Sequence, residues 1–317
     1  MTRSLRKWVA ALIAVAAAFA TGSACAEPLL YSATVRLATG GSPTAPAGSL
    51  YVIDPATAKT RMVGALRVNG KPIGVTGIAV HPKTGVVFGV TAGSSVNYPN
   101  ALVIIDAASG EASLVGETRV PTSDIAFSPD GHLYMWLTQT NQVGEINIGT
   151  GRVRAIGTPS QPSWIEAGIS VDARGFVFVT PEGATGPLEQ RDPATGAVMS
   201  SISLSNAPYL SSLNSLAFSK SGELFGVNSN MGTPAHTALV KIDLGTGVIT
   251  KVGDLPEDTD CLAFVDAPRT SFLARQSNST LVIGGSALAG VVVLGVALFM
   301  RRRTRRQPPP GEAAGRA

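Results

Sequence analysis

The chain has few of the residues from which most catalytic and metal sites are built. It contains two cysteines and three histidines in 317 residues. The HExxH, CxxC, GxSxG and P-loop patterns do not occur in it. The histidines, His81, His132 and His236, fall in separate turns and loops of the repeat described below. We therefore do not expect a histidine-based zinc site or a catalytic triad.

Charged residues are also scarce, at 15% of the chain, and the net charge of +4 comes from its two ends. Of the 25 basic residues, three precede residue 27 and six follow residue 300, so 16 remain against 20 acidic residues over 27–280. That central region carries a net charge of about −4 and shows no basic patch interleaved with aromatics. Nucleic acid is therefore not an expected partner.

Residues 1–26 have the pattern of a secretory signal peptide. Three basic residues precede an apolar run over 8–20, and Ala-Cys-Ala at 24–26 fits a cleavage site. Lipidation of Cys25 is the alternative, although Gly22 stands where a lipobox has leucine. Cleavage after Ala26 leaves Cys261 as the only cysteine, so the exported chain forms no internal disulfide.

A second apolar segment lies near the C-terminus. Residues 281–300 carry no charge and are long enough to span a membrane as a helix. The arginines within 301–306 predict that the basic tail, 301–317, is cytoplasmic and disordered. A polar stalk over 269–280 precedes the span. The alternative is a sorting signal of the GlyGly type, which Gly284-Gly285 and the arginines resemble, and whether a protease processes this tail stays open.

Between these ends the chain repeats one unit of four short strands. In the copy over 123–157, strand-like segments alternate with turns rich in Gly, Asp and Asn. The first strand of the unit recurs about every 44–47 residues, a spacing typical of propeller blades. Its copies are Ile78-Ala79-Val80, Ile125-Ala126-Phe127, Ile169-Ser170-Val171, Leu216-Ala217-Phe218 and Leu262-Ala263-Phe264.

Two further markers accompany each copy. The second strand contains a motif of Gly, any residue, an aliphatic residue and an aromatic residue. The aromatic residues are Phe88, Tyr134, Phe178 and Phe225. An Asp or Asn ends the third strand, with Gly four residues later except in the first copy, which has Ala58. We expect the small central residue of each first strand to suit a crowded inner ring. Its bulky neighbours then pack against the aromatic of the adjacent blade.

The two ends of the repeat region complete each other. The region begins with second-strand material at 29–35 and ends with a lone first strand at 261–265. Together they make one blade, so we expect an all-β, five-bladed propeller of four-stranded antiparallel meanders closed by its chain ends. The pattern, clearest in IAFSPDGHLY at 125–134, resembles the bacterial β-propeller repeats of the YVTN/NHL/WD40-like class. The resemblance covers residues 27–268 and implies the fold, but leaves the function open.

Three loop insertions predict one functional rim. They lie at 37–49, 91–100 and 228–237, each between a second and a third strand. In a propeller these loops share one face with the entries to the first strands, and we call this face the top rim. Loops on a rigid scaffold commonly carry binding residues.

Polar residues that precede the first strands enter from the top rim close to the axis. Among them we predict a ligand site made by Asp124, Glu166, Asn214 and Asp260. Carboxylate and amide oxygens around one axis suit a hard cation such as Ca²⁺. The alternative is that these residues form turns and bond their own backbone.

Three functions remain open at this stage. The leading hypothesis is a single-pass membrane protein whose propeller, outside the cytoplasm, binds a protein, peptide or glycan without catalysis. The second is a metal-dependent hydrolase of the lactonase or gluconolactonase type that uses the axial carboxylates. The third is a structural scaffold of the cell envelope. The sequence names neither the ligand nor the oligomeric state.

Overall fold

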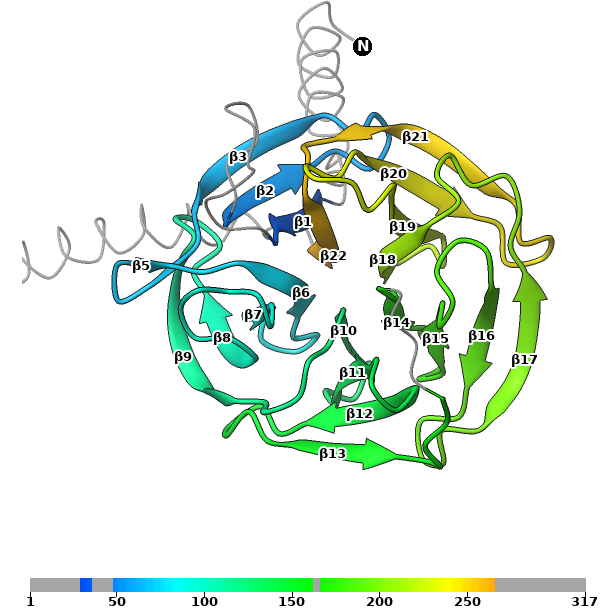
Figure 1. Ribbon diagram of the computed structural model, residues 1–317, viewed down its shortest axis with the longest axis horizontal. Coiled ribbons are helices and arrows are strands. Elements are labelled where there is room, and N and C mark those ends of the chain that lie inside the picture. The colour runs from blue at the N-terminus through cyan, green and yellow to red at the C-terminus, as the bar shows by residue number, and fades with distance from the viewer. Residues whose placement is uncertain (1–28, 36–47, 162–165, 266–317) are drawn as a thin grey trace, which may run out of the picture. The chain divides into compact units, whose positions relative to one another are not determined.

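In the computed structural model each repeat forms a four-stranded antiparallel sheet, and five such sheets surround a central axis (Figure 1). The structure describes residues 29–35, 48–161 and 166–265. The predicted signal peptide, stalk, membrane span and tail lie outside the described residues, as does most of the loop at 37–49.

In each blade the first strand lies nearest the axis and the fourth lies outermost (Figure 1). From the axis outward, blade 1 contains β22 (Thr259–Val265), β1 (Leu29–Thr34), β2 (Ser49–Ile53) and β3 (Thr60–Ala65). Blade 2 contains β6 (Val75–Val80), β7 (Val87–Thr91), β8 (Ala101–Ile105) and β9 (Glu111–Glu117). Blade 3 contains β10 (Ile125–Phe127), β11 (Leu133–Leu137), β12 (Gln142–Ile146) and β13 (Val153–Ile156). Blade 4 contains β14 (Ile169–Val171), β15 (Val177–Val179), β16 (Pro187–Arg191) and β17 (Val198–Ser203). Blade 5 contains β18 (Ser212–Phe218), β19 (Leu224–Ser229), β20 (Thr237–Ile242) and β21 (Ile249–Leu255).

The two ends of the propeller close the ring as predicted. β22 pairs antiparallel with β1, with Phe264 opposite Leu30 and Cys261 opposite Ala33. Blade 1 is thus completed by a strand more than two hundred residues later in the chain. The pairing gives β1 a partner on its inner side, and this removes an exposed edge from the closing blade.

The inner strands pack as their aligned residues predict. The first residue of each triplet is apolar and at most 2% exposed. These residues are Ile78, Ile125, Ile169, Leu216 and Leu262. Two residues further along, the last residue of a first strand meets the aromatic of the preceding blade. Three such pairs are edge-to-face with ring centroids 5.1–5.5 Å apart, namely Phe88–Phe127, Phe178–Phe218 and Phe225–Phe264. Such geometry adds to the energy of apolar burial.

The turn between the third and fourth strands is built identically in all five blades. Its Asp or Asn accepts the backbone N–H two residues later at 2.8–3.0 Å. Four blades then place Gly in the left-handed region, where a Cβ would lie 2.1–2.9 Å from a backbone oxygen of the preceding blade. Blade 1 has Ala58 there, at φ 56°. Its Cβ fits because Gly253 faces it, and a Cβ on Gly253 would lie 2.8 Å away.

One element was missed by the sequence prediction. A short hairpin, β4 (Arg67–Val68) and β5 (Lys71–Pro72), lies between blades 1 and 2, and β4 runs parallel to β9. Its turn is Asn69-Gly70, with φ of 52° and 74°. Asn-Gly is a strong hairpin signal, but flanking strands of two residues each are too short to show the alternation from which a hairpin is predicted.

Candidate functional site

The four predicted site residues lie at the starts of the inner strands. Asp124 and Glu166 precede β10 and β14, whereas Asn214 and Asp260 belong to β18 and β22. Asp124, Asn214 and Asp260 are at most 4% exposed, and Glu166 is partly exposed. The sequence placed all four near the axis, and the structure joins three of them directly.

The joined residues form what we call the axial cluster: Glu166, Asn214, Asp260 and Thr76. The Asn214 amide donates to Glu166 Oε2 at 2.8 Å and to Asp260 Oδ1 at 2.5 Å. The Thr76 hydroxyl lies 2.6 Å from the other oxygen of Asp260. The cluster therefore connects blades 1, 2, 4 and 5 through side chains. Thr76 lies at the start of the inner strand β6, but a hydroxyl carries a weaker signal for a site than a carboxylate.

Asp124 makes a different set of contacts. Its Oδ2 accepts the backbone N–H groups of Ile169 and Leu216, each at 3.1 Å. These amides belong to blades 4 and 5, while Asp124 belongs to blade 3. One carboxylate oxygen therefore ties three blades together at the axis.

The antiparallel ladder explains why these amides are free for Asp124. In blade 4, Gly168 and Asp172 pair with the second strand through their backbones. Residues between them, such as Ile169, consequently turn their N–H groups toward the axis. The same alternation holds at Leu262, whose N–H donates to Ser215 Oγ at 2.9 Å. A buried amide needs a partner, and the inner strands obtain theirs from side chains of other blades.

Close packing of the inner strands limits which side chains fit there. Gly77, Asp124, Gly168, Ser215 and Cys261 occupy equivalent positions. A Cβ on Gly168 would lie 2.6 Å from the Ser215 carbonyl carbon, and a Cβ on Gly77 would lie 2.9 Å from the Ile125 nitrogen. Because Gly168 offers no acceptor, Asp124 supplies one to Leu216 in the next blade. The Asp124 carboxylate therefore accepts backbone hydrogen bonds from other blades.

Burial dominates the electrostatics of the axis. It raises the pKa of the Asp124 carboxyl well above 3.8, against the opposing effect of hydrogen bonds from Ile169 and Leu216. Burial, followed by the charge of Glu166, raises the pKa of Asp260, although Asn214 and Thr76 oppose this. Both carboxyls therefore favour the protonated form more than an exposed aspartate does.

The axial cluster does not have the geometry of the predicted Ca²⁺ site. Asn214 turns its donor toward both carboxylates, whereas a cation needs its oxygen, and that oxygen is buried with no hydrogen-bond partner. Over the described residues, no group of three or more His, Cys, Asp or Glu side chains is placed to hold a metal. The arrangement of these side chains is a hydrogen-bonded network rather than a coordination shell.

A cavity of about 140 Å³ lies further along the axis, toward the rim opposite the top rim. Its wall includes the ends of the inner strands, with Phe127, Phe218 and Phe264 on one set of blades and Val80 and Val171 on the others. Ser170 is its polar side chain, and its hydroxyl accepts the N–H of Phe218 at 3.2 Å. The sequence did not predict this cavity, because the triplets that line it have the composition of a core.

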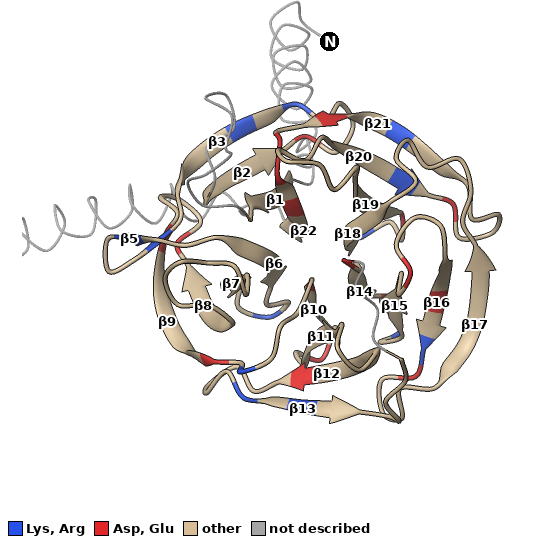
Figure 2. Ribbon diagram, viewed as in Figure 1, with Lys and Arg blue, Asp and Glu red and all other residues tan. Residues whose placement is uncertain are grey.

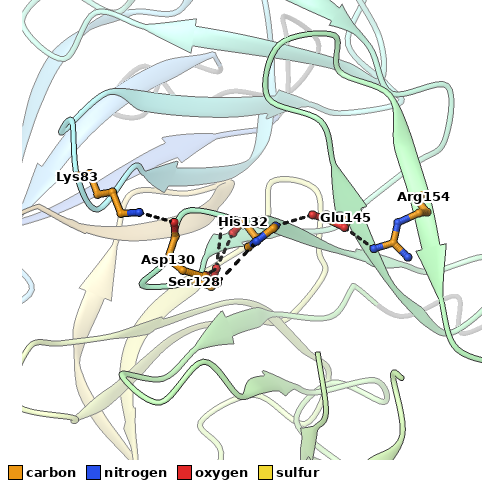
Figure 3. Close-up of polar contacts among 6 residues, drawn as sticks. All are labelled: Lys83, Ser128, Asp130, His132, Glu145 and Arg154. Carbon is orange, nitrogen blue, oxygen red and sulfur yellow. Dashed lines mark hydrogen bonds and ion pairs between the residues drawn. The ribbon is translucent and has the colours of Figure 1, made fainter. Parts of the chain in front are cut away.

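The turn between β10 and β11, on the rim opposite the top rim, contains a group of polar contacts (Figure 3). Ser128 Oγ donates to the Asp130 carboxylate and accepts the backbone N–H of His132. The Lys83 ammonium, from blade 2, donates to the backbone oxygen of Asp130 at 2.8 Å. The hydroxyl is thus occupied by its own turn and is not bonded to the imidazole.

The His132 ring instead contacts a carboxylate on β12. Its Nδ1 lies 2.6 Å from Glu145 Oε1, and Arg154 donates to the second oxygen at 2.5 Å (Figure 3). Partial burial raises the pKa of Glu145, but the bonds from His132 and Arg154 outweigh it and lower the value. Within this network the Ser128 hydroxyl bonds its own turn, and the Lys83 contact joins blade 2 to blade 3.

Comparisons with known proteins show a likeness of fold alone. No protein-family model matches the chain, and no curated protein sequence matches it. A nidogen/laminin complex structure is 13% identical, with a TM-score of 0.46 over 75% of this chain and 98% of that chain. A gluconolactonase from Xanthomonas campestris is 12% identical, with a TM-score of 0.43 over 75% and 84%. Virginiamycin B lyase from Staphylococcus aureus is 14% identical, with a TM-score of 0.40 over 70% and 73%.

These similarities include binding proteins and enzymes, and they indicate no particular function for this chain. The strand order and register establish the five-bladed propeller independently of them. Within the described residues, no helix combines the length and the apolar character that a membrane crossing requires. The predicted span at 281–300 lies outside those residues.

Proposed function

We propose that this protein is an exported propeller of the YVTN/NHL/WD40-like class that binds a protein, peptide or glycan through its top rim, without catalysis. In this proposal the signal peptide at 1–26 directs export. The helix at 281–300 anchors the propeller outside the cytoplasm, and residues 301–317 remain in the cytoplasm. The axial cluster and Asp124 hold the blades that support the rim.

The observation that carries the proposal is the strained backbone of the top rim, where non-glycine residues adopt positive φ. Eight of the nine described non-glycine residues with positive φ lie in top-rim loops. Three of them, Tyr98, Arg119 and Met231, have bulky side chains, for which this conformation costs on the order of 1–3 kcal/mol. Such strain persists only where surrounding contacts maintain it, and it is common at binding sites.

Apolar side chains on the same rim face solvent. Val96 is 76% exposed and Leu210 is 78% exposed, the largest values for large apolar residues in the described part of the chain. Val96 lies in the loop between β7 and β8, and Leu210 lies in the connection between β17 and β18. Exposed apolar groups at loop tips favour contact with a partner, since burial against it removes them from water.

The top-rim loops are also held in place before any partner arrives. In the loop between β7 and β8, the Asn97 side chain donates to the backbone oxygen of Pro72 at 2.9 Å, and Ser95 Oγ accepts the Gly74 N–H at 3.2 Å. In the loop between β19 and β20, the Asn230 side chain accepts the N–H groups of Gly232 and His236 at 2.9–3.0 Å. A preorganised loop loses little conformational entropy on binding.

No observation favours the two competing hypotheses as specifically. A metal-dependent hydrolase requires a coordination shell, and the axial carboxylates Asp124, Glu166 and Asp260 are engaged in hydrogen bonds to other blades. A structural scaffold requires an extended contact surface but no preorganised loops. We therefore place the ligand contact on the loops, with Asp124, Glu166, Asn214 and Asp260 beneath it.

Binding to immobilised glycans and displayed peptides tests this proposal. The full chain, purified in detergent, is compared with Val96→Asp and Leu210→Asp. Matched controls are Ile148→Asp and Leu244→Asp, which alter residues 36% and 41% exposed in the turns between third and fourth strands. We expect the top-rim variants to weaken binding at least about tenfold, which corresponds to roughly 1.4 kcal/mol. Equal losses from both sets, or no binding by any variant, contradict the proposal.

Protease treatment of intact spheroplasts tests the location. We expect an added protease to cleave exposed loops of the propeller and to spare a peptide tag fused after Ala317. Lysis of the spheroplasts should then expose the tag as a control. A protected propeller with a digested tag would reverse the proposed orientation.

A further inference from the structure

The cavity on the axis is walled by the backbones of the five inner strands. In four blades the residue that directly follows the inner strand donates its backbone N–H to the residue before the second strand; these donors are His81, Ser128, Asp172 and Ser219. In an antiparallel ladder, residues that bond the neighbouring strand alternate with residues whose N–H and C=O groups point away from it. The first and third residues of each triplet therefore turn both backbone groups toward the axis.

These backbone groups give the cavity more acceptors than donors. Three of the N–H groups, at Leu216, Phe218 and Leu262, are already bonded by side chains of other blades. In the part of the chain that the structure describes, no hydrogen bond engages the carbonyl oxygen of any axis-facing residue on the cavity wall. A buried carbonyl needs a partner, so the cavity suits an occupant that is positive or donates hydrogen bonds. The axis-facing residues on its wall are Ile78, Val80, Ile125, Phe127, Val171, Leu216, Phe218, Leu262 and Phe264.

Charge on the axis favours a cation over an anion. Toward the top rim the axis is closed by Asp124, whose Oδ2 accepts the N–H of Leu216, a residue of the cavity wall, and whose Oδ1 is buried with no hydrogen-bond partner. No Lys or Arg occurs in the five inner strands, and Asp260 is the one charged residue in them (Figure 2). A cation beneath Asp124 would stabilise the ionised carboxylate.

We propose that the axial cavity binds a monovalent alkali cation through the backbone carbonyl oxygens of the inner strands, with the Asp124 carboxylate as its counter-charge. Rings of backbone carbonyls replace the hydration shell of such ions in channels. A divalent cation such as Ca²⁺ takes several carboxylates into its shell, and no acidic side chain lines this cavity. The volume of about 140 Å³ leaves room for the ion with part of its water. The proposal is independent of the ligand contact on the top rim, because the cavity lies toward the opposite rim.

Thermal unfolding of the full chain in detergent tests the proposal, with KCl, NaCl and choline chloride compared at equal ionic strength. Choline carries the same charge, but its methyl groups keep that charge away from oxygen ligands. We expect the midpoint to be higher in one of the alkali salts and to rise with its concentration, as for any ligand that binds only the folded chain. At about ten times the dissociation constant, the shift should be about 3–6 °C for a domain of this size.

A matched pair of serine variants locates the effect. Ser170→Ala removes a hydroxyl oxygen from the cavity wall and releases the N–H of Phe218, so it should reduce the alkali-dependent shift. Ser212→Ala makes the same change at another buried serine of an inner strand, one that does not line the cavity, and it should leave the shift intact. Asp124→Asn removes the counter-charge and should reduce the shift as well, whereas Asp243→Asn at an outer turn should not.

Three results would overturn the proposal. Equal midpoints in all three salts would mean that the cavity holds water alone. A stabilisation that follows chloride, and is lost when potassium gluconate replaces KCl, would identify an anion site. Equal loss of the alkali-dependent shift in Ser170→Ala and Ser212→Ala would place the cation elsewhere in the molecule.

Discussion

Aspartates serve opposite purposes at the axis and at the outer turns of this propeller. Asp124 and Asp260 are at most 1% exposed and bond groups of other blades, and burial raises the pKa of both. Asp54 and Asp243 lie in the turns between third and fourth strands and bond their own turn, which lowers their pKa. The comparison shows that one residue type secures the ring at its centre and shapes each blade at its edge.

The difference follows from how many backbone groups lack a partner in each place. At the turns, the carboxylate replaces hydrogen bonds that water would otherwise supply, so its contribution is small. At the axis, the amides of the inner strands are shut away from bulk water and depend on a few side chains. Loss of an axial partner should therefore cost far more than loss of a turn partner.

Removal of a whole inner strand should have the largest effect. A chain that ends after Leu255 loses β22, together with Asp260, and exposes the inner side of β1. We expect it to aggregate and to lose cooperative unfolding, because blade 1 then carries an open inner edge along β1. Urea unfolding and light scattering measure this, with a chain ending at residue 268 as the control. If both chains unfold reversibly at the same urea concentration, closure by the chain ends is wrong.

Asp124→Ala should have the next largest effect. The substitution leaves the buried amides of Ile169 and Leu216 without their acceptor. At about 1–3 kcal/mol for each unsatisfied group, we expect the free energy of unfolding to fall by about 2–6 kcal/mol. Asp124→Asn retains an acceptor oxygen and should cost clearly less. One ordinary hydrogen bond contributes about 1 kcal/mol. A smaller loss for Asp124→Ala would mean that Asp124 contributes no more to stability than an aspartate of an outer turn.

Gly168→Ala should cost about 1–3 kcal/mol, as overpacking does in a rigid core. The added Cβ would lie 2.6 Å from the Ser215 carbonyl carbon and 2.8 Å from the Leu216 nitrogen, and backbone atoms do not move aside easily. Gly149→Ala is the control, because its Cβ meets nothing closer than Asn147 Oδ1 at 3.5 Å. Chemical denaturation of both variants gives the values. Equal costs would show that the axis is no more tightly packed than a turn.

Acidification should affect the two sets of carboxyls in opposite directions. The folded-state pKa of Asp124 lies above 3.8, so folding takes up a proton, and its contribution to stability grows as the pH falls toward 3.8. The pKa of Asp243 lies below 3.8, so its contribution is present above that pH and is lost as the pH falls through the folded-state value. Thermal unfolding of Asp124→Asn and Asp243→Asn from neutral pH downward measures each contribution. The same pH trend in both would contradict the comparison.

Ala58→Gly should have the smallest effect. The substitution relieves a left-handed alanine, but it also increases the freedom of the unfolded chain. We expect a change within about 1 kcal/mol. Gly247→Ala is the opposite test, since its Cβ would lie 2.1 Å from the Ser203 oxygen, and it should be strongly destabilising. A large loss from Ala58→Gly would mean that the Ala58 methyl group packs on Gly253 and stabilises the contact between blades 1 and 5.

Local sequence pattern was sufficient for the repeating parts of the molecule. The first-strand triplets and the Asp-to-Gly turns recur at a spacing that demands one blade each, and the incomplete ends could only be completed by each other. The long loops also fell between second and third strands, as the spacing required. Local chemistry did not suffice for the β4–β5 hairpin, whose parallel contact with β9 depends on how blades 1 and 2 meet.

The candidate site was predictable in position but not in connectivity. Entry to the first strands placed Asp124, Glu166, Asn214 and Asp260 near the axis from their numbering. Nothing in the sequence showed that Asn214 lies between two carboxylates, that Thr76 completes the cluster, or that Asp124 reaches the amides of two other blades. Whether these four residues bind a ligand stays a prediction.

The sequence by itself determined the strands within each blade and the chemistry of the turns, because these depend on residues close together in the chain. The number of blades followed from counting the repeats and joining the two incomplete ends. Only the tertiary structure decided which buried groups meet at the axis. Hydrogen bonds there join residues 45 to 184 positions apart, and their geometry depends on the angle and distance at which blades face one another. Those quantities arise from packing around the ring, which no single repeat contains.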